Sequence, residues 1–254
     1  MAKKKRSKKL SKKQKKSKTK LWGKYHAFVF LIFLWGLSNI AHQVYRHPSI
    51  LFLPISVFFN KTVFETYESY GDVIHENAGN KIDPFFMASL IQVESMGNPL
   101  ATTYWSFNFL TEPWKMYAPA STATGLLQVT KPTWDTVLKY CQNAKASVRN
   151  QSCNHWFGSY RVFPSHAIEL TSFWFKKHLS KWKNLSSRNA RQTLAVLHLC
   201  GPAKAKRFIR NSFHWGSLGR CGSHSPSAYY SKVERQRKRL KSIINTNYRL
   251  AKVY

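Results

Sequence analysis

The chain has 254 residues, with 41 lysines and arginines against 10 aspartates and glutamates, which gives a formal net charge of +31. This length allows one domain of moderate size with accessory segments. Residues 1–24 hold 13 of the basic residues and no acidic one, so their composition excludes a packed core, and we expect a disordered basic tail there.

Residues 25–45, "YHAFVFLIFLWGLSNIAHQVY", contain no Lys, Arg, Asp or Glu. The stretch has about the 20 residues that a transmembrane helix needs. The basic block before it predicts an N-terminus in the cytoplasm and a body outside. A cleaved signal peptide is the alternative, although no convincing cleavage site follows. The first cysteine is Cys141, which excludes a lipid-modified N-terminal cysteine.

We interpret residues 46–62 as a linker. Its stretch "SILFLPISVFF" (49–59) is too short and too proline-broken for a second span. It is expected to lie at the membrane interface or to pack on the domain.

The remaining chain predicts a mainly α domain over residues 63–254, because helical spacing of apolar residues recurs and no alternating strand pattern is visible. Residues 102–122 are aromatic and proline-marked, and we expect a long loop. Ser165 is a candidate helix cap. The predicted helices are 65–79, 83–96, 132–141, 165–182, 190–201 and 226–250.

Within the second of these helices, Asp83 and Pro84 provide a start signal. An apolar face follows, and Glu94 falls in phase with it near the helix end. Neither burial nor the helix dipole favours a charged carboxylate there. Burial instead favours the protonated form, which is the form that a general acid requires. The alternative is a glutamate that leans from the helix end into solvent.

The motif series "VESMGNPLA" (93–101), "GLLQVTKPTW" (125–134), "LAVLHLCGPAKAKRF" (194–208) and "SPSAYYSKV" (225–233) resembles the family 1 lytic transglycosylases, the SLT domain. "SHAIELTSFWFKKHLSKW" (165–182) resembles the family helix between the second and third of these motifs, and "SPSAYYSKV" resembles its last helix. The resemblance covers about residues 65–240. Residues 102–120 look like an insertion, and Thr122 replaces a glycine. His198 and Leu199 replace the family's Tyr and Asn, and that Tyr hydrogen-bonds at the catalytic site.

The resemblance implies a lysozyme-like α fold and cleavage of the β-1,4 bond between MurNAc and GlcNAc in peptidoglycan, with formation of 1,6-anhydroMurNAc. Glu94 would serve as the single acid and base, which suits a chain with few carboxylates. The expected substrate-binding residues are Gln128, His198, Ser95 and Tyr117. Trp105, Trp114 and Tyr117 could stack on sugars or belong to the core, and Ser95 could simply bond at its helix end. No cofactor and no metal are expected. The alternative is an inactive peptidoglycan-binding protein of the same fold.

The expected partners are glycan strands and a bacterial inner membrane, with the catalytic domain in the periplasm. A nucleic-acid-binding interpretation fits the charge, but no nucleic-acid-binding module is recognised, and we expect no nucleic acid.

Four cysteines fall on the predicted outer side, which indicates disulfides. Sequence allows three pairings, of which we favour Cys141–Cys153 and Cys200–Cys221. The alternative is four buried thiols. A zinc site built from residues between His198 and His224 is less favoured, because the ligand spacing is not typical of zinc.

Overall fold

A computed structural model describes residues 2–46, 51, 53–107, 117–143, 161–182 and 185–251. Its secondary structure is mainly helical, as the sequence predicts. The chain divides into two units. One comprises residues 1–50 and 105–118, and the other comprises residues 51–104 and 119–254. Each unit is described by itself.

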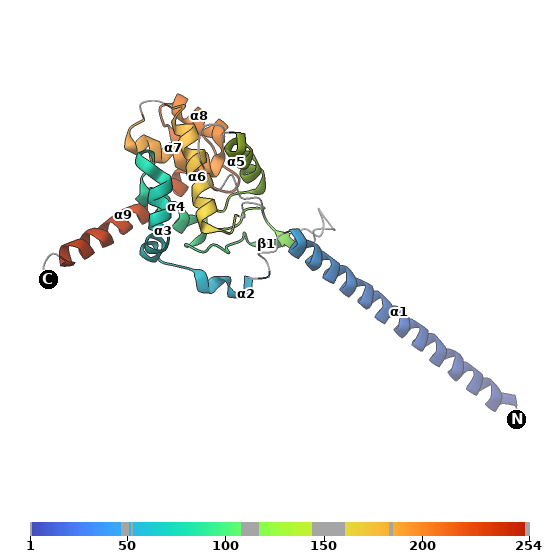
Figure 1. Cartoon of the computed structure of the whole chain (residues 1–254). Helices are drawn as coiled ribbons and strands as arrows, with labels where there is room; N and C mark the ends of the chain where they lie inside the picture. Colours follow the sequence, from blue (N-terminus) through green and yellow to red (C-terminus); the bar gives the residue numbers. More distant parts are fainter. Residues whose placement is uncertain are drawn as a thin grey trace. The chain divides into compact units, whose positions relative to one another are not determined.

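The first unit is dominated by one continuous helix, α1 (Ala2–Arg46) (Figure 1). The basic tail predicted to be disordered therefore starts this helix. Lys, Arg and Gln are good helix formers, and the first glycine is Gly23, so nothing in the tail interrupts a helix locally.

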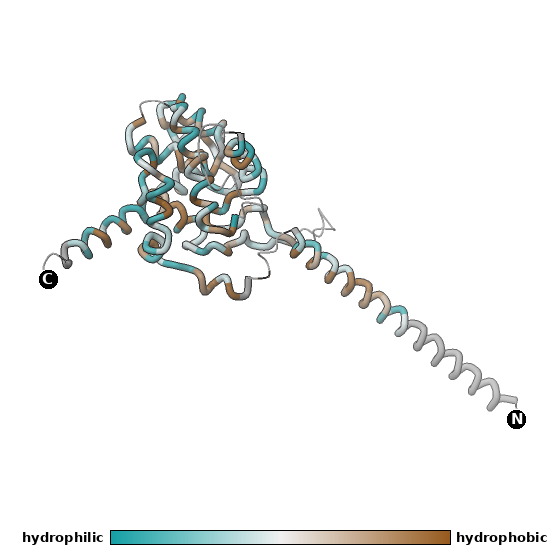
Figure 2. The backbone as a smooth tube through the Cα atoms, viewed as in Figure 1, coloured by the Kyte–Doolittle hydropathy of each residue, from teal (hydrophilic) through white to brown (hydrophobic). Residues whose placement is uncertain are grey.

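Residues Trp22–Tyr45 of α1 are long and apolar enough to cross a membrane. The brown stretch of α1 in Figure 2 shows this apolar segment. Every side chain from Phe28 to Leu34 is at least 44% exposed. Apolar side chains on all sides of a helix suit a lipid surrounding. The predicted span at residues 25–45 is thus confirmed in its length and composition.

A two-stranded sheet joins β1 (Trp105–Phe107) and β2 (Tyr117–Pro119). The prediction of an irregular loop over residues 102–122 is therefore wrong at both ends. Aromatic and β-branched residues favour strands, but three-residue strands are too short to produce a visible alternation. The ring centroids of Trp105 and Tyr117 lie 4.8 Å apart. Trp114 lies outside the described residues.

In the second unit, α4 (Pro84–Ser95) is the central helix. Asp83 caps it by accepting hydrogen bonds from the Phe85 and Phe86 amides, and Pro84 takes the first position. This confirms the predicted start signal. The helix is buried on several sides rather than on one face, with its fully buried side chains at Phe86, Met87, Ala88, Ser89, Leu90 and Ile91.

The neighbours of α4 are α3 (Val63–Ala78) and α9 (Pro226–Ala251), which both pack against it. A capping box between Thr62 and Glu65 starts α3, because each side chain bonds the other residue's backbone amide. The end of α9 projects beyond the other helices of its unit (Figure 1).

The remaining helices complete the second unit. α6 packs against α3 and α5, and α7 packs against α8 and α9. The predicted linker contains α2 and η2, so the unit begins before residue 63. The bounds are α2 (Leu53–Ser56), η2 (Val57–Phe59), η3 (Gly79–Lys81), α5 (Lys131–Asn143), α6 (Pro164–Leu179), α7 (Ser187–Cys200), α8 (Pro202–Arg210) and η7 (Trp215–Ser217).

The predicted cap Ser165 lies inside α6, which begins at Pro164 with Phe163 as its N-cap. Proline has no amide hydrogen to satisfy and its φ suits the first helical position. Pro164 therefore sets the start of the helix, and no side chain caps it.

Candidate functional site

The carboxyl group of Glu94 lies where three helices of the second unit meet. Glu94 stands in the last turn of α4, which ends at Met96 in the left-handed conformation. Its Oε1 accepts a hydrogen bond from the Tyr229 hydroxyl of α9. The same oxygen lies 3.3 Å from Nε2 of His198 on α7, and the Glu94 side chain is only 16% exposed. The glutamate is therefore shielded from water and held by two polar rings.

Tyr229 belongs to this cluster, but the sequence did not single it out. Burial raises its pKa well above the ordinary value, and the charge of Glu94 and the hydrogen bond to it raise the pKa further. The phenol therefore stays protonated and acts as a donor toward Glu94. The stretch "SPSAYYSKV" resembles the last family helix, but spacing along the sequence does not reveal that Tyr229 reaches across to α4.

His198 stands in the last turn of α7. It is the residue that replaces the family's Tyr and that the sequence predicts to bind substrate. Its ring is edge-on to Phe175, with centroids 6.2 Å apart, and its side chain is 11% exposed. The structure thus brings His198 to Glu94. Which ring nitrogen carries the proton depends on the tautomer, and only an N–H at Nε2 can donate toward the carboxylate.

Beside His198 is a cavity of about 470 Å³. Glu94 is not among the residues that line it. His198 therefore belongs both to the cavity wall and to the Glu94 cluster. The lining residues in the described part of the chain include no Asp or Glu, and they are Gln128, Val129, Thr130, Pro132, Thr133, Trp134, Thr136, Val137, Leu170, Thr171, Trp174, Leu197, His198, Leu199, Cys200, Gly201 and Pro202.

Gln128 stands at the end of a tight turn that opens on this cavity. Its backbone has φ +46°. The nitrogen of its side-chain amide, Nε2, donates hydrogen bonds to the carbonyls of Ala101 and Gly125, each at 2.9 Å. Its side-chain oxygen accepts no hydrogen bond from the described residues. This oxygen can therefore accept a hydrogen bond from a ligand in the cavity.

Gly125 allows this turn, with φ +79° and the backbone of Arg161 lying where a Cβ would be. A side chain there would clash and would also be strained. The Arg161 guanidinium donates to the carbonyls of Thr122 and Val129, which ties both ends of the turn to one side chain. Burial lowers the pKa of Arg161, partly opposed by the charge of Asp135.

The other two predicted binding residues have different surroundings. Ser95 is buried, and its hydroxyl lies 2.7 Å from the Leu126 carbonyl, to which it donates. It thus joins the end of α4 to the Gly125 turn and does not line the cavity. Tyr117 is 46% exposed and belongs to the other unit, so its predicted sugar contact stays a prediction.

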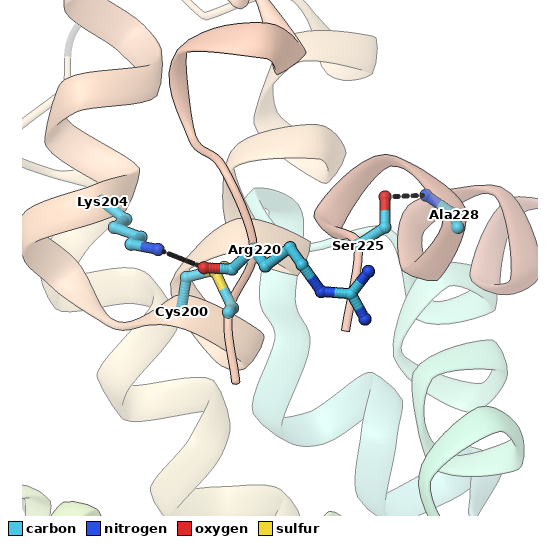
Figure 3. Close-up of a disulfide and its surroundings, with 6 residues drawn as sticks. Cys200, Lys204, Arg220, Ser225 and Ala228 are labelled. Atoms are coloured by element: carbon cyan, nitrogen blue, oxygen red, sulfur yellow. Dashed lines mark hydrogen bonds between the residues drawn. A yellow bond between two sulfur atoms is a disulfide. The ribbon is translucent and has the colours of Figure 1, made fainter. Parts of the chain in front are cut away.

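A disulfide joins Cys200, at the end of α7, to Cys221 (Figure 3). This predicted pair is confirmed, and its sulfurs are not available as zinc thiolates. Lys204 donates to the Arg220 carbonyl at 2.6 Å across the same loop. The bridge therefore fixes the segment that follows His198. The other predicted pair involves Cys153, which lies outside the described residues.

A second cluster joins the same three helices away from Glu94. Arg237 on α9 donates to Asp83 at the start of α4 at 3.1 Å and to Glu234 at 2.6 Å. Arg191 on α7 lies 3.8 Å from Asp83 and 3.6 Å from Glu234. Burial raises the pKa of Glu234, but Arg237 and Arg191 outweigh it and hold the pKa below its usual value.

No group of three or more His, Cys, Asp or Glu in the described residues is placed to hold a metal ion. Comparison of the chain with family models, with curated proteins and with solved structures found no match.

Proposed function

We propose that this chain is a peptidoglycan lytic transglycosylase that cleaves the MurNAc-β-1,4-GlcNAc bond and uses Glu94 as its single acid and base. The observation that carries the proposal is the shielded Glu94 carboxyl, contacted by Tyr229 and His198 beside a cavity. The motif series that resembles the SLT domain supplies Glu94 and His198 to this cluster, and Gln128 and His198 to the cavity wall. Glu94, Gln128 and His198 come from three separate members of that series.

The two oxygens of Glu94 have different surroundings. Tyr229 and His198 both contact Oε1, whereas no described residue hydrogen-bonds Oε2. In the protonated acid, the proton belongs on Oε2, because Oε1 already accepts from Tyr229. Oε2 is thus the oxygen that reaches the substrate, and the two rings fix the plane of the carboxyl group.

The reaction needs only one carboxyl group. Glu94 gives its proton to the glycosidic oxygen as the C1–O bond breaks. The carbonyl oxygen of the substrate's own 2-acetamido group stabilises the positive charge at C1. The Glu94 carboxylate then takes the proton from the C6 hydroxyl as O6 bonds to C1, which closes the anhydro ring and restores the acid. Ordinary glycosidases need a second carboxylate for this stage.

The cavity beside His198 is the proposed binding place for a sugar ring. Trp134 and Trp174 line it and supply the flat apolar surface that suits the face of a hexose. The Gln128 side-chain oxygen would accept a hydrogen bond from the amide N–H of an acetamido group in this cavity. Binding there would bring the adjoining glycosidic bond past His198 to Glu94.

We also propose that α1 anchors the chain in a bacterial inner membrane, with the second unit in the periplasm. The length and composition of Trp22–Tyr45 support the anchoring. The basic block before this stretch supports the orientation, and the Cys200–Cys221 disulfide fits an oxidising compartment.

The test is digestion of purified peptidoglycan by the full chain in detergent. The expected products end in 1,6-anhydroMurNAc, as measured by mass spectrometry. Glu94→Gln keeps the side-chain shape but cannot transfer the proton, so its rate should fall by about 10⁴-fold or more. Asp135→Asn is the matched control, since Asp135 forms an exposed pair with Lys131.

Two outcomes would overturn the proposal. Reducing MurNAc ends would indicate a hydrolase. An intact sacculus that still retains the protein would indicate the inactive binding protein.

A further inference from the structure

The second unit begins with an unusually exposed apolar segment. Within residues 51–59, Phe58 is 83% exposed and Val57 is 67% exposed. Leu51, Ile55 and Phe59 are also exposed, and α2 is among the brown stretches in Figure 2. Water contact of so many large apolar side chains is unfavourable, and such a surface marks an interaction site.

The folded unit holds this segment in place at the end of α4. The buried Asn98 amide donates to the Ser56 carbonyl at 2.6 Å and to the Asn60 side chain at 3.0 Å. The Lys61 amide donates to the Met96 carbonyl at 2.7 Å. The exposed apolar side chains therefore do not belong to a loose tail, because the segment is hydrogen-bonded to the helix end.

Met96 extends the apolar surface. It caps α4 two residues after Glu94, and its side chain is 52% exposed. The other large exposed apolar residues of this unit in the described chain are single and separated in sequence, at Tyr104, Tyr140, Phe163 and Tyr248. We name the set Leu51, Ile55, Val57, Phe58, Phe59 and Met96 the apolar entry surface.

In the sequence, the apolar segment 51–59 closely follows the proposed membrane anchor. Five residues separate Tyr45, the last residue of the apolar stretch of α1, from Leu51. A fully extended chain of that length spans at most about 20 Å. If Tyr45 lies at the membrane surface, Leu51 cannot lie farther away than this. The composition also suits this position, since residues 47–60 contain no Lys, Arg, Asp or Glu.

We infer that the apolar entry surface lies in the interfacial layer of the phospholipid bilayer and forms a second membrane attachment beside α1. Its aromatic and aliphatic side chains enter the boundary between headgroups and acyl chains. Because Asn98 and Met96 connect the surface to α4, this attachment orients the helix that carries Glu94. The inference rests on the proposed anchoring but not on the proposed catalysis.

The test places a photoreactive group on the surface in the full chain. Phe58→p-benzoylphenylalanine is reconstituted in vesicles of phosphatidylethanolamine and phosphatidylglycerol and irradiated. Val57→p-benzoylphenylalanine repeats the test at a second site, in case the first variant does not fold. Tyr140→p-benzoylphenylalanine is the matched control, because Tyr140 is 42% exposed on α5, which lies apart from α2 within the same unit (Figure 1).

Mass spectrometry should find phospholipid adducts at positions 57 and 58 and few at position 140. Lipid adducts at positions 57 and 58 no more frequent than at position 140 would overturn the inference. Cross-linked dimers in place of lipid adducts would overturn it too, since they would show that a second copy covers the surface. Neither outcome depends on enzyme activity, so failure here differs from failure of the glycan digest.

Discussion

At the scale of single residues, the hydrogen bond from Tyr229 to Glu94 is the contact with the clearest consequence. Tyr229→Phe removes one hydroxyl and leaves Oε1 with His198 alone. In the proposed reaction Glu94 becomes charged as it gives up its proton, and a hydrogen bond to a charged group contributes about 1.5–3 kcal/mol, against about 1 kcal/mol for a neutral one. Loss of this difference should slow glycan cleavage by about 10-fold.

The matched control is Tyr70→Phe, because the Tyr70 hydroxyl donates at 3.1 Å to the Gly97 carbonyl but does not contact Glu94. Both variants should lose about 1 kcal/mol of unfolding free energy. Only Tyr229→Phe should lose activity, as measured by the release of muropeptides. Equal rates for the two variants would show that Tyr229 has a structural role alone.

The His178 side chain on α6 is a buried titrating group whose pKa is strongly shifted. Burial is the main cause that lowers its pKa to about 4, and the charges of Lys181 and Lys177 contribute to the same shift. Trp174 and Trp182 flank the ring, with centroids at 4.2 and 5.3 Å.

Because the unfolded chain has the ordinary pKa of 6.5, it binds a proton between pH 6.5 and about 4 that the folded chain does not bind. The unfolding free energy should therefore be largest above pH 6.5 and should fall through this window as pH falls. His178→Phe removes the ring that binds this proton. The variant's unfolding free energy should therefore fall less between pH 6.5 and about 4. Urea unfolding at pH 7.5 and 5.0 measures the difference, and identical pH dependence of the two proteins would contradict it.

At the scale of elements, the ionic cluster around Arg237 sets how α4, α7 and α9 meet. Arg237→Gln leaves Asp83 and Glu234 with only the longer contacts to Arg191. The side chains of Arg237 and Glu234 are 11% and 17% exposed. This burial is intermediate between surface and interior, so we expect a loss of about 2 kcal/mol in unfolding free energy.

Lys131→Gln is the control, because it removes an exposed pair whose side chains are 62% and 47% exposed. Such a pair contributes about 0.5 kcal/mol or less. Denaturant unfolding should therefore separate the two variants clearly. Similar losses for both would mean that the Arg237 cluster is only a surface feature.

The sequence predicted those features of the fold that depend on local signals. Asp83 before Pro84 marked the start of α4, Gly201 marked the end of α7, and the nearest cysteines predicted the Cys200–Cys221 bridge. These signals act over a few residues, or over a short loop, and are visible in a single chain. The start of α6 at Pro164 also depends on a local signal, but Ser165 was expected as its cap instead.

The candidate site could be predicted only in part, for the same reason. Glu94, Gln128 and His198 carried motif signals, and the structure brings His198 to Glu94. Tyr229 lies 135 positions from Glu94, and Arg237 lies 154 positions from Asp83. Contacts over such separations depend on how α9 packs on α4, which spacing along one chain does not reveal.

At the scale of the whole molecule, the charge distribution separates the two sides of the proposed membrane. Residues 1–24 hold 13 Lys and Arg, whereas residues 46–62 hold only Arg46 and Lys61. The basic residues close to a span determine its orientation, and those in distant domains contribute little. The positive charge of the rest of the body therefore does not oppose an orientation with the N-terminus inside.

This asymmetry predicts a periplasmic second unit. A reporter that fluoresces only in the cytoplasm, fused after Tyr254 in a bacterial host, should stay dark. Replacement of the 12 Lys and Arg of residues 3–20 by Gln removes the charge difference and leaves the apolar stretch of α1 intact. Part of that population should then insert the other way round, and its fluorescence should rise.

The neutralised variant tests the cause as well as the orientation, because a dark signal from both proteins at equal abundance would show that the basic block does not set the topology. A bright unmodified fusion would contradict the periplasmic placement itself, and with it the access of Glu94 to peptidoglycan.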